Sequence, residues 1–138
     1  MGKVDLHFQP TVQVFDANMY LGRPHDRRVT VHTPEDTIEA MQKAGITRAL
    51  VHHPHADFRD SHDGNGWLME LVANSSSLVP QFVCNPSFDN LDDFAAEVKE
   101  FGIRSVRMVP TYHMYPFQDW VVGRWLEWLE DENIPLWI

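Results

Sequence analysis

The sequence predicts an α/β fold in which parallel strands alternate with helices. Two observations carry this prediction: short β-branched or apolar runs alternate with longer helical patterns along the chain, and the links between them are short. Short links of this kind join parallel strands through right-handed crossovers. Two architectures fit: a five-stranded doubly wound parallel sheet, and the N-terminal part (about five β/α units) of a (β/α)₈ barrel. The count of elements alone favours the complete sheet.

The first predicted strand, 11–16, is a run rich in β-branched residues and is followed by a loop. Thr33 then matches a helix N-cap, Pro34 the first helical position, and Gly45 the residue at which the helix ends. The apolar run 46–53 predicts the second strand. These residues form one strand–helix–strand unit.

The same alternation continues through the rest of the sequence. Apolar residues at helical spacing predict a helix over 65–74, and the run 78–84 predicts a third strand that tolerates Pro80 near its beginning. In the loop before that helix we expect solvent-facing or capping aspartates and turn glycines, namely Asp57, Asp60, Asp63, Gly64 and Gly66. The remaining predicted elements are a helix over 89–102, a strand over 103–109, a helix over 118–132 and a strand over 134–138.

Composition limits the classes of partner. The chain has 138 residues, 43% of them apolar, which predicts a single domain over 1–138. Lys and Arg number 11 against 20 Asp and Glu, and the net charge of −9 disfavours nucleic-acid and membrane-surface partners. The single cysteine, Cys84, cannot form an internal disulfide, and no apolar run approaches the roughly 20 residues that span a bilayer. Because residues 1–6 have no signal-peptide pattern, we expect a cytoplasmic protein.

Function in a parallel sheet lies at the carboxyl ends of the strands. The polar residues that follow the predicted strands are therefore the candidates: Asn18 and Tyr20, His52, His53 and His55, Asn85, and Arg107 with Tyr112 and His113. The sequence has no glycine-rich phosphate loop and no Gly-x-Ser-x-Gly elbow, which argues against nucleotide-binding proteins and serine hydrolases.

His53-Pro54-His55 is the sharpest local motif. Two imidazoles one residue apart at a strand end can point to the same side and share one metal ion, and Pro54 would stiffen that geometry. The alternative is a polar loop whose histidines form local hydrogen bonds or face water.

Arg107 stands inside an apolar strand, where an unpaired charge is costly. One interpretation is a bidentate clamp for a carboxylate or phosphate. The other is a salt bridge to an acidic residue on a neighbouring strand.

The segment Val14-Phe15-Asp16-Ala17-Asn18-Met19-Tyr20-Leu21-Gly22 resembles the first-strand signature of the amidohydrolase superfamily, in its amidohydrolase-related (amidohydrolase 2) branch of TIM-barrel metal-dependent hydrolases and decarboxylases. Segments that resemble the next four strands of that family follow in order at 44–51, 79–86, 102–108 and 133–138. The resemblance covers nearly the whole chain and therefore favours the partial barrel over the complete sheet. The apolar last strand would then need further strands to cover its edge, and an exposed edge favours association, for example as a homo-oligomer.

The chain departs from the family at the metal ligands. Members that bind a metal have His-x-His after the first-strand Asp, whereas Asn18 and Tyr20 occupy those positions here. Both are weak ligands beside imidazole, and the family's other ligands follow later strands. A zinc or manganese ion would have to use another set, such as His53 and His55.

The resemblance implies a hydrolase that acts on a small carboxylated or amide-like substrate at the C-terminal face of the barrel. We expect Asn18, Tyr20, Asn85 and Arg107 to bind the substrate, and His53 or His113 to be the general base because imidazole titrates near neutrality. A related decarboxylase (a carbon–carbon lyase) and a metal-free descendant that binds a ligand or partner without catalysis are the alternatives. These 138 residues alone are not expected to be active.

Overall fold

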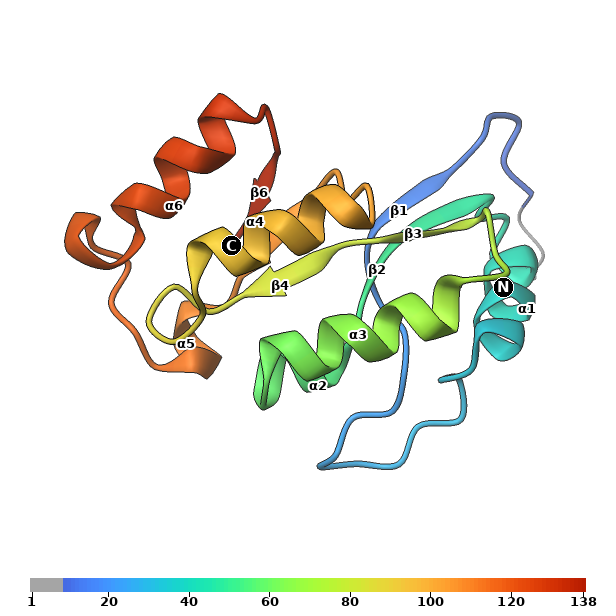
Figure 1. Cartoon of the computed structure of the whole chain (residues 1–138). Coiled ribbons are helices and arrows are strands. Elements are labelled where there is room, and N and C mark those ends of the chain that lie inside the picture. The colour runs from blue at the N-terminus through green and yellow to red at the C-terminus, as the bar shows by residue number, and fades with distance from the viewer. Residues whose placement is uncertain (1–8) are drawn as a thin grey trace, which may run out of the picture.

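A computed structural model describes residues 9–138, and residues 1–8, for which no signal peptide is predicted, lie outside the described part (Figure 1). The strands are β1 (Phe15–Tyr20), β2 (Arg48–His52), β3 (Leu78–Pro80), β4 (Phe82–Cys84), β5 (Val106–Met108) and β6 (Leu136–Trp137). The helices are α1 (Pro34–Lys43), α2 (Pro54–Phe58), α3 (Ser61–Val72), α4 (Leu91–Glu100), α5 (Pro110–His113) and α6 (Asp119–Asp131). No helix within residues 9–138 has the length and apolar character needed to cross a membrane.

The strands form two parallel three-stranded sheets, β1-β2-β3 and β4-β5-β6. The segment 78–84 connects them, because its first half pairs with β2 and its second half with β5. The change of partner occurs at Gln81, whose backbone N donates to Val51 O at 2.8 Å, while the next N, of Phe82, donates to Ser105 O at 3.3 Å. The single strand predicted over 78–84 is therefore divided into β3 and β4.

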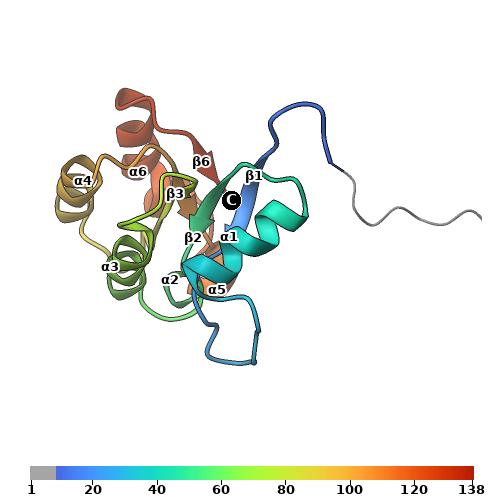
Figure 2. The ribbon, with the colours of Figure 1, turned by 90° about the vertical axis from the view of Figure 1, so that its right-hand side faces the viewer.

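The predicted α/β class with parallel strands is confirmed, but the doubly wound alternative is wrong. In each sheet the strand order follows the chain, without the reversal that a doubly wound sheet contains. Side chains from α1, α3, α4 and α6 pack into one hydrophobic cluster with the strands, and Figure 2 shows α3, α4 and α6 together on one side. These helices are therefore not distributed over two faces.

Alternation along the strands directs successive side chains to two opposite faces. Every second strand residue joins the cluster under the helices: Ala49 and Val51 of β2, Phe82 and Cys84 of β4, and Val106 and Met108 of β5. Their largest partners from the helices are Met41, Leu68, Phe94 and Trp125. The alternate residues are directed to the opposite face, where His52, Gln81 and Arg107 lie along with the buried apolar Leu50 and Val83.

The first strand differs from the prediction, because it spans Phe15–Tyr20 rather than 11–16. Asn18 and Tyr20 therefore lie inside a strand and not after it. Pairing with the buried β2 selects this segment, despite its polar residues, because strand formation depends on the neighbouring strand more than on intrinsic preference. Within this polar stretch the pairing with β2 is irregular, between Asp16 and Met19.

The loop predicted before the second helix is instead largely helical. Pro54 begins the short helix α2 after the N-cap His53, and α3 begins at Ser61 after the N-cap Asp60. Gly64 and Gly66, predicted as turn residues, lie within α3, and Asp57, predicted to face solvent or cap a helix, is buried in α2. The two helices pack closely enough that a Cβ atom at Gly64 would clash with the Ala56 backbone.

The contact between α2 and α3 can be tested with two glycines of the same helix. We expect Gly64→Ala to lower the free energy of unfolding by roughly 1–3 kcal/mol, because the added methyl group must displace α2. In the matched variant Gly66→Ala the added Cβ has no atom within 4 Å. This variant is expected to raise the free energy of unfolding by up to about 1 kcal/mol, because alanine has a higher helix propensity than glycine. Urea unfolding of both variants measures the difference, and equal stability would contradict this packing.

Candidate functional site

Arg107 of β5 is the centre of a hydrogen-bonded row that crosses the sheets. Its Nε donates to Gln81 Oε1 at 2.8 Å, and its Nη2 donates to Asn18 Oδ1 at 2.7 Å. Gln81 is fully buried and is oriented in turn by its own Nε2, which donates to Ser105 Oγ at 2.7 Å. The guanidinium group of Arg107 is thus held in one position by two neutral amide oxygens, from Asn18 of β1 and from Gln81 between β3 and β4.

The positive charge of Arg107 has no carboxylate beside it. None of the ion pairs within residues 9–138 includes Arg107, so the predicted salt bridge to a neighbouring strand is not present in this part of the chain. Burial lowers the pKa of Arg107 from its ordinary value, and the more distant charges of Asp57 and Tyr20 act in the opposite direction. The Trp137 ring lies 5.8 Å from Cζ and adds a weak cation–π contact. Three of the five guanidinium N–H donors are not used by these bonds.

Next to Arg107, three residues from β1, β2 and α2 form a second polar group. His52 and Asp57 are buried, and His52 Nε2 lies 3.2 Å from Asp57 Oδ2. The Tyr20 ring packs on the His52 ring with centroids 4.6 Å apart, yet Tyr20 is 42% exposed. Burial raises the pKa of the Tyr20 phenol to about 12, and the nearby charge of Asp57 adds to this rise. Tyr20 is therefore a neutral hydroxyl near pH 7.

His53 serves the local structure of the chain. As N-cap of α2 its Nδ1 accepts a hydrogen bond from the backbone N of His55 at 3.0 Å, so the neutral ring carries its proton on Nε2. The ring lies against Gly22, which has a φ of +112° and leaves no room there for a Cβ atom. Burial lowers the pKa of His53 to about 4, and the nearby His55 contributes to this shift.

The arrangement of His53 and His55 does not fit the metal ion predicted for them. A hydrogen bond occupies one nitrogen of His53, the other carries its proton, and the two ring centroids lie 6.4 Å apart. The His55 ring packs on Trp67, with centroids 4.3 Å apart. Over residues 9–138, no three His, Cys, Asp or Glu side chains come together as ligands for a metal ion.

The other two predicted site residues, Asn85 and His113, belong to a separate cluster. Asn85 Oδ1 accepts hydrogen bonds from Ser87, and the backbone N of Asn85 donates to Asp89 Oδ2 at 2.7 Å. His113 Nε2 bonds the carbonyl oxygen of Ala56 at 2.9 Å and so connects α5 to α2. These bonds stabilise local turns and helix contacts, and none of them reaches Arg107. Asn18, Tyr20 and Arg107 are the predicted residues that the structure brings together.

Sequence reasoning missed Gln81, and it noted His52 only as a strand-end residue. Gln81 had a usable signal, since a glutamine in the middle of an apolar strand must find buried partners. Asp57 was assigned to a solvated loop because three aspartates at regular spacing resemble a polar surface. Pro54 was the available indication that a helix begins there and carries Asp57 back to the strand end.

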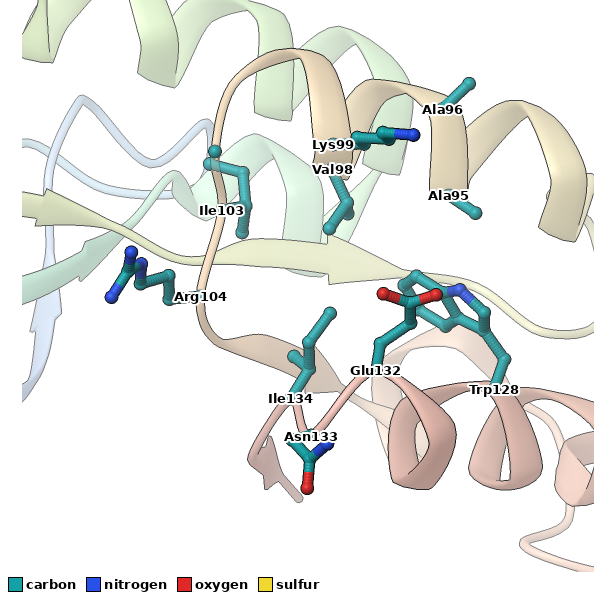
Figure 3. Close-up of a pocket in the computed structure, with 11 residues that line it drawn as sticks. Ala95, Ala96, Val98, Lys99, Ile103, Arg104, Trp128, Glu132, Asn133 and Ile134 are labelled. Carbon is teal, nitrogen blue, oxygen red and sulfur yellow. The ribbon is translucent and has the colours of Figure 1, made fainter.

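A cavity of about 680 Å³ lies elsewhere, between α4 and α6 (Figure 3). It is lined by residues such as Val98, Ile103, Arg104 and Ile134. Ile103 and Arg104 precede β5 and Ile134 precedes β6, so this cavity is at the amino ends of the strands. Because functional groups of parallel sheets gather at the carboxyl ends, we assign no site to it.

No family model, curated protein or solved structure matches the chain. The resemblance to the amidohydrolase superfamily consequently stays a prediction from the residues themselves.

The lowered pKa of His53 predicts a dependence of stability on pH. Because the unfolded histidine titrates near 6.5 and the folded one near 4, the unfolded state binds more protons between these values. The contribution of His53 to the free energy of unfolding is fully present above pH 6.5 and decreases as the pH falls toward 4. The total decrease is up to about 3 kcal/mol, because a difference of one pKa unit corresponds to about 1.4 kcal/mol.

The measurement is urea unfolding at several pH values for wild type and His53→Asn, whose side-chain oxygen can replace Nδ1 as the cap. The variant is expected to lose stability less steeply between pH 6.5 and 4. His25→Asn, a matched change at an exposed histidine, is expected to follow the wild type. A His53→Asn curve parallel to the wild type would show that His53 is not protected from protonation.

Proposed function

We propose that this protein is an amidohydrolase-like hydrolase that binds a small carboxylate-bearing substrate with Arg107 at the carboxyl ends of its strands. The observation that carries the proposal is that Arg107 is fixed by Asn18 and Gln81 without any carboxylate within ion-pair distance in residues 9–138. Arg107 is partly buried, and a charge that is partly removed from water without an acidic partner carries a free-energy cost. A substrate carboxylate can supply that missing charge.

The neutral partners of Arg107 make it suitable for this role. Amide oxygens orient the guanidinium group but do not neutralise it, so its charge is retained for a ligand. The unused N–H donors can form two parallel charge-assisted hydrogen bonds with a carboxylate. The adjacent Tyr20 hydroxyl, on the same strand as Asn18, can contact the rest of such a substrate.

The fold supports the family on which the proposal draws. Strands in chain order, with α1, α3, α4 and α6 packed into one cluster, are the arrangement expected of the first part of a (β/α)₈ barrel. In that fold the active site lies at the carboxyl ends of the strands, where Tyr20, His52 and Arg107 are found. Asn18 and Tyr20, which replace the family's His-x-His, here face Arg107 and Asp57.

Binding is tested first, by calorimetric titration with succinate. Arg107→Gln is expected to weaken succinate binding roughly tenfold or more, because hydrogen bonds to charged groups contribute about 1.5–3 kcal/mol. Arg104→Gln removes the same charge from an exposed arginine that precedes β5 and serves as the matched control. Equal affinity of wild type and Arg107→Gln for succinate would contradict the carboxylate site.

Hydrolysis is tested with two esters that differ in charge, p-nitrophenyl hydrogen succinate and p-nitrophenyl acetate. The proposal predicts a lower KM for the carboxylate-bearing ester, and the loss of this preference in Arg107→Gln. Binding of succinate without hydrolysis of either ester would contradict the hydrolase. It would favour the alternatives, a related decarboxylase or a protein that binds a small carboxylate without catalysis.

A further inference from the structure

The buried pair His52–Asp57 is placed beside the proposed carboxylate site but cannot reach a substrate directly. Asp57 is 1% exposed and His52 is 2% exposed. The Tyr20 ring packs on the His52 ring with centroids 4.6 Å apart, the charge of Asp57 acts on the Tyr20 phenol, and Tyr20 is 42% exposed. Its strand also carries Asn18, the residue that holds Arg107. The phenol thus lies between the buried pair and the position where a substrate of Arg107 would be bound.

We propose that Tyr20 is a catalytic residue that transfers a proton between a substrate held by Arg107 and the buried Asp57, with His52 as a positioning residue for Asp57. This inference rests on the proposed function, because it gives the same site its means of proton transfer. None of the residues involved has to act as a metal ligand.

Unsatisfied polar atoms in the pair support this assignment. Asp57 Oδ1 and both ring nitrogens of His52 are buried and have no hydrogen-bond partner within residues 9–138, although His52 Nε2 lies 3.2 Å from Asp57 Oδ2. A buried polar atom without a partner costs free energy, so pairs kept only for stability are usually fully hydrogen-bonded. The open oxygen of Asp57 is instead available to accept a proton.

The groups around Tyr20 favour a proton transfer in which the phenol stays neutral. Four groups face it, each from a different element: His52 of β2, Asp57 of α2, Tyr112 of α5 and Arg107 of β5. Burial and Asp57 raise the pKa of Tyr20, and Arg107 lowers it. Since the pKa of about 12 disfavours ionisation, the phenol must receive one proton as it gives the other away.

For an ester substrate the reaction balances as follows. A water oxygen attacks the ester carbonyl carbon, one water proton moves to the Tyr20 oxygen, and the Tyr20 proton moves to Asp57. The tetrahedral intermediate then collapses, the bond from carbon to the leaving oxygen breaks, and the proton returns from Asp57 through Tyr20 to that oxygen. The products are the acid and the alcohol, and water is the only co-reactant.

The test is steady-state hydrolysis of p-nitrophenyl hydrogen succinate by wild type, Tyr20→Phe, Asp57→Asn and Tyr115→Phe. Tyr20→Phe and Asp57→Asn are expected to lower kcat by roughly 100-fold or more with little change in KM, because positioned proton transfer contributes about 10²–10⁴-fold. Tyr115→Phe is the matched control: it removes a tyrosine hydroxyl that has no hydrogen-bond partner within residues 9–138 and that is not among the groups facing Tyr20, and it should retain the wild-type kcat. Thermal unfolding of each variant verifies that it is folded. If Asp57→Asn is unfolded, the kcat of Tyr20→Phe alone decides the test.

The outcomes separate this inference from the proposed function. A wild-type kcat in Tyr20→Phe overturns the proton transfer even if Arg107→Gln raises KM as the carboxylate site requires. Conversely, a KM that does not respond to Arg107→Gln overturns the carboxylate site, while a loss of kcat in Tyr20→Phe still supports the role of Tyr20. A full-length wild-type protein that hydrolyses neither ester overturns both.

Discussion

The hydrogen bonds of the Arg107 guanidinium group are the interaction on which the rest of the site depends. They connect Asn18 of β1, Gln81 between β3 and β4, and Arg107 of β5, so residues far apart in sequence are fixed around one positive charge. Gln81 is also the residue at which the segment 78–84 changes from one sheet to the other. The same side chain therefore marks the junction of the two sheets and sets the orientation of Arg107.

The two faces of the strands contribute differently: one stabilises the fold and the other carries the polar residues of the site. One face is apolar, packs under α1, α3, α4 and α6, and provides the hydrophobic burial that stabilises the domain. The other carries the row of polar residues, which satisfy one another through Asn18, Gln81, Ser105 and Arg107. Because the apolar layer supports this row, the Arg107 guanidinium can remain without an acidic partner while the hydrophobic core keeps the domain folded.

The alternation of strands and helices and the parallel class could be predicted from sequence, because each depends on local patterns. The β-branched and apolar runs identified the strands, and Thr33 with Pro34 correctly marked the start of α1. The boundaries of β1 could not be predicted, since pairing with β2 overrides the polarity of Asp16 and Asn18. The partner of His52 was missed for a similar reason: only the packing of α2 against α3 carries Asp57 into the interior.

A crystal structure of the protein soaked in malonate tests the central claim most directly. The account predicts a malonate carboxylate bound to the free N–H groups of Arg107, with the bonds from Arg107 to Asn18 and Gln81 intact. Malonate bound only away from Arg107, or an Arg107 side chain paired with a carboxylate of its own chain such as Asp57, would contradict it.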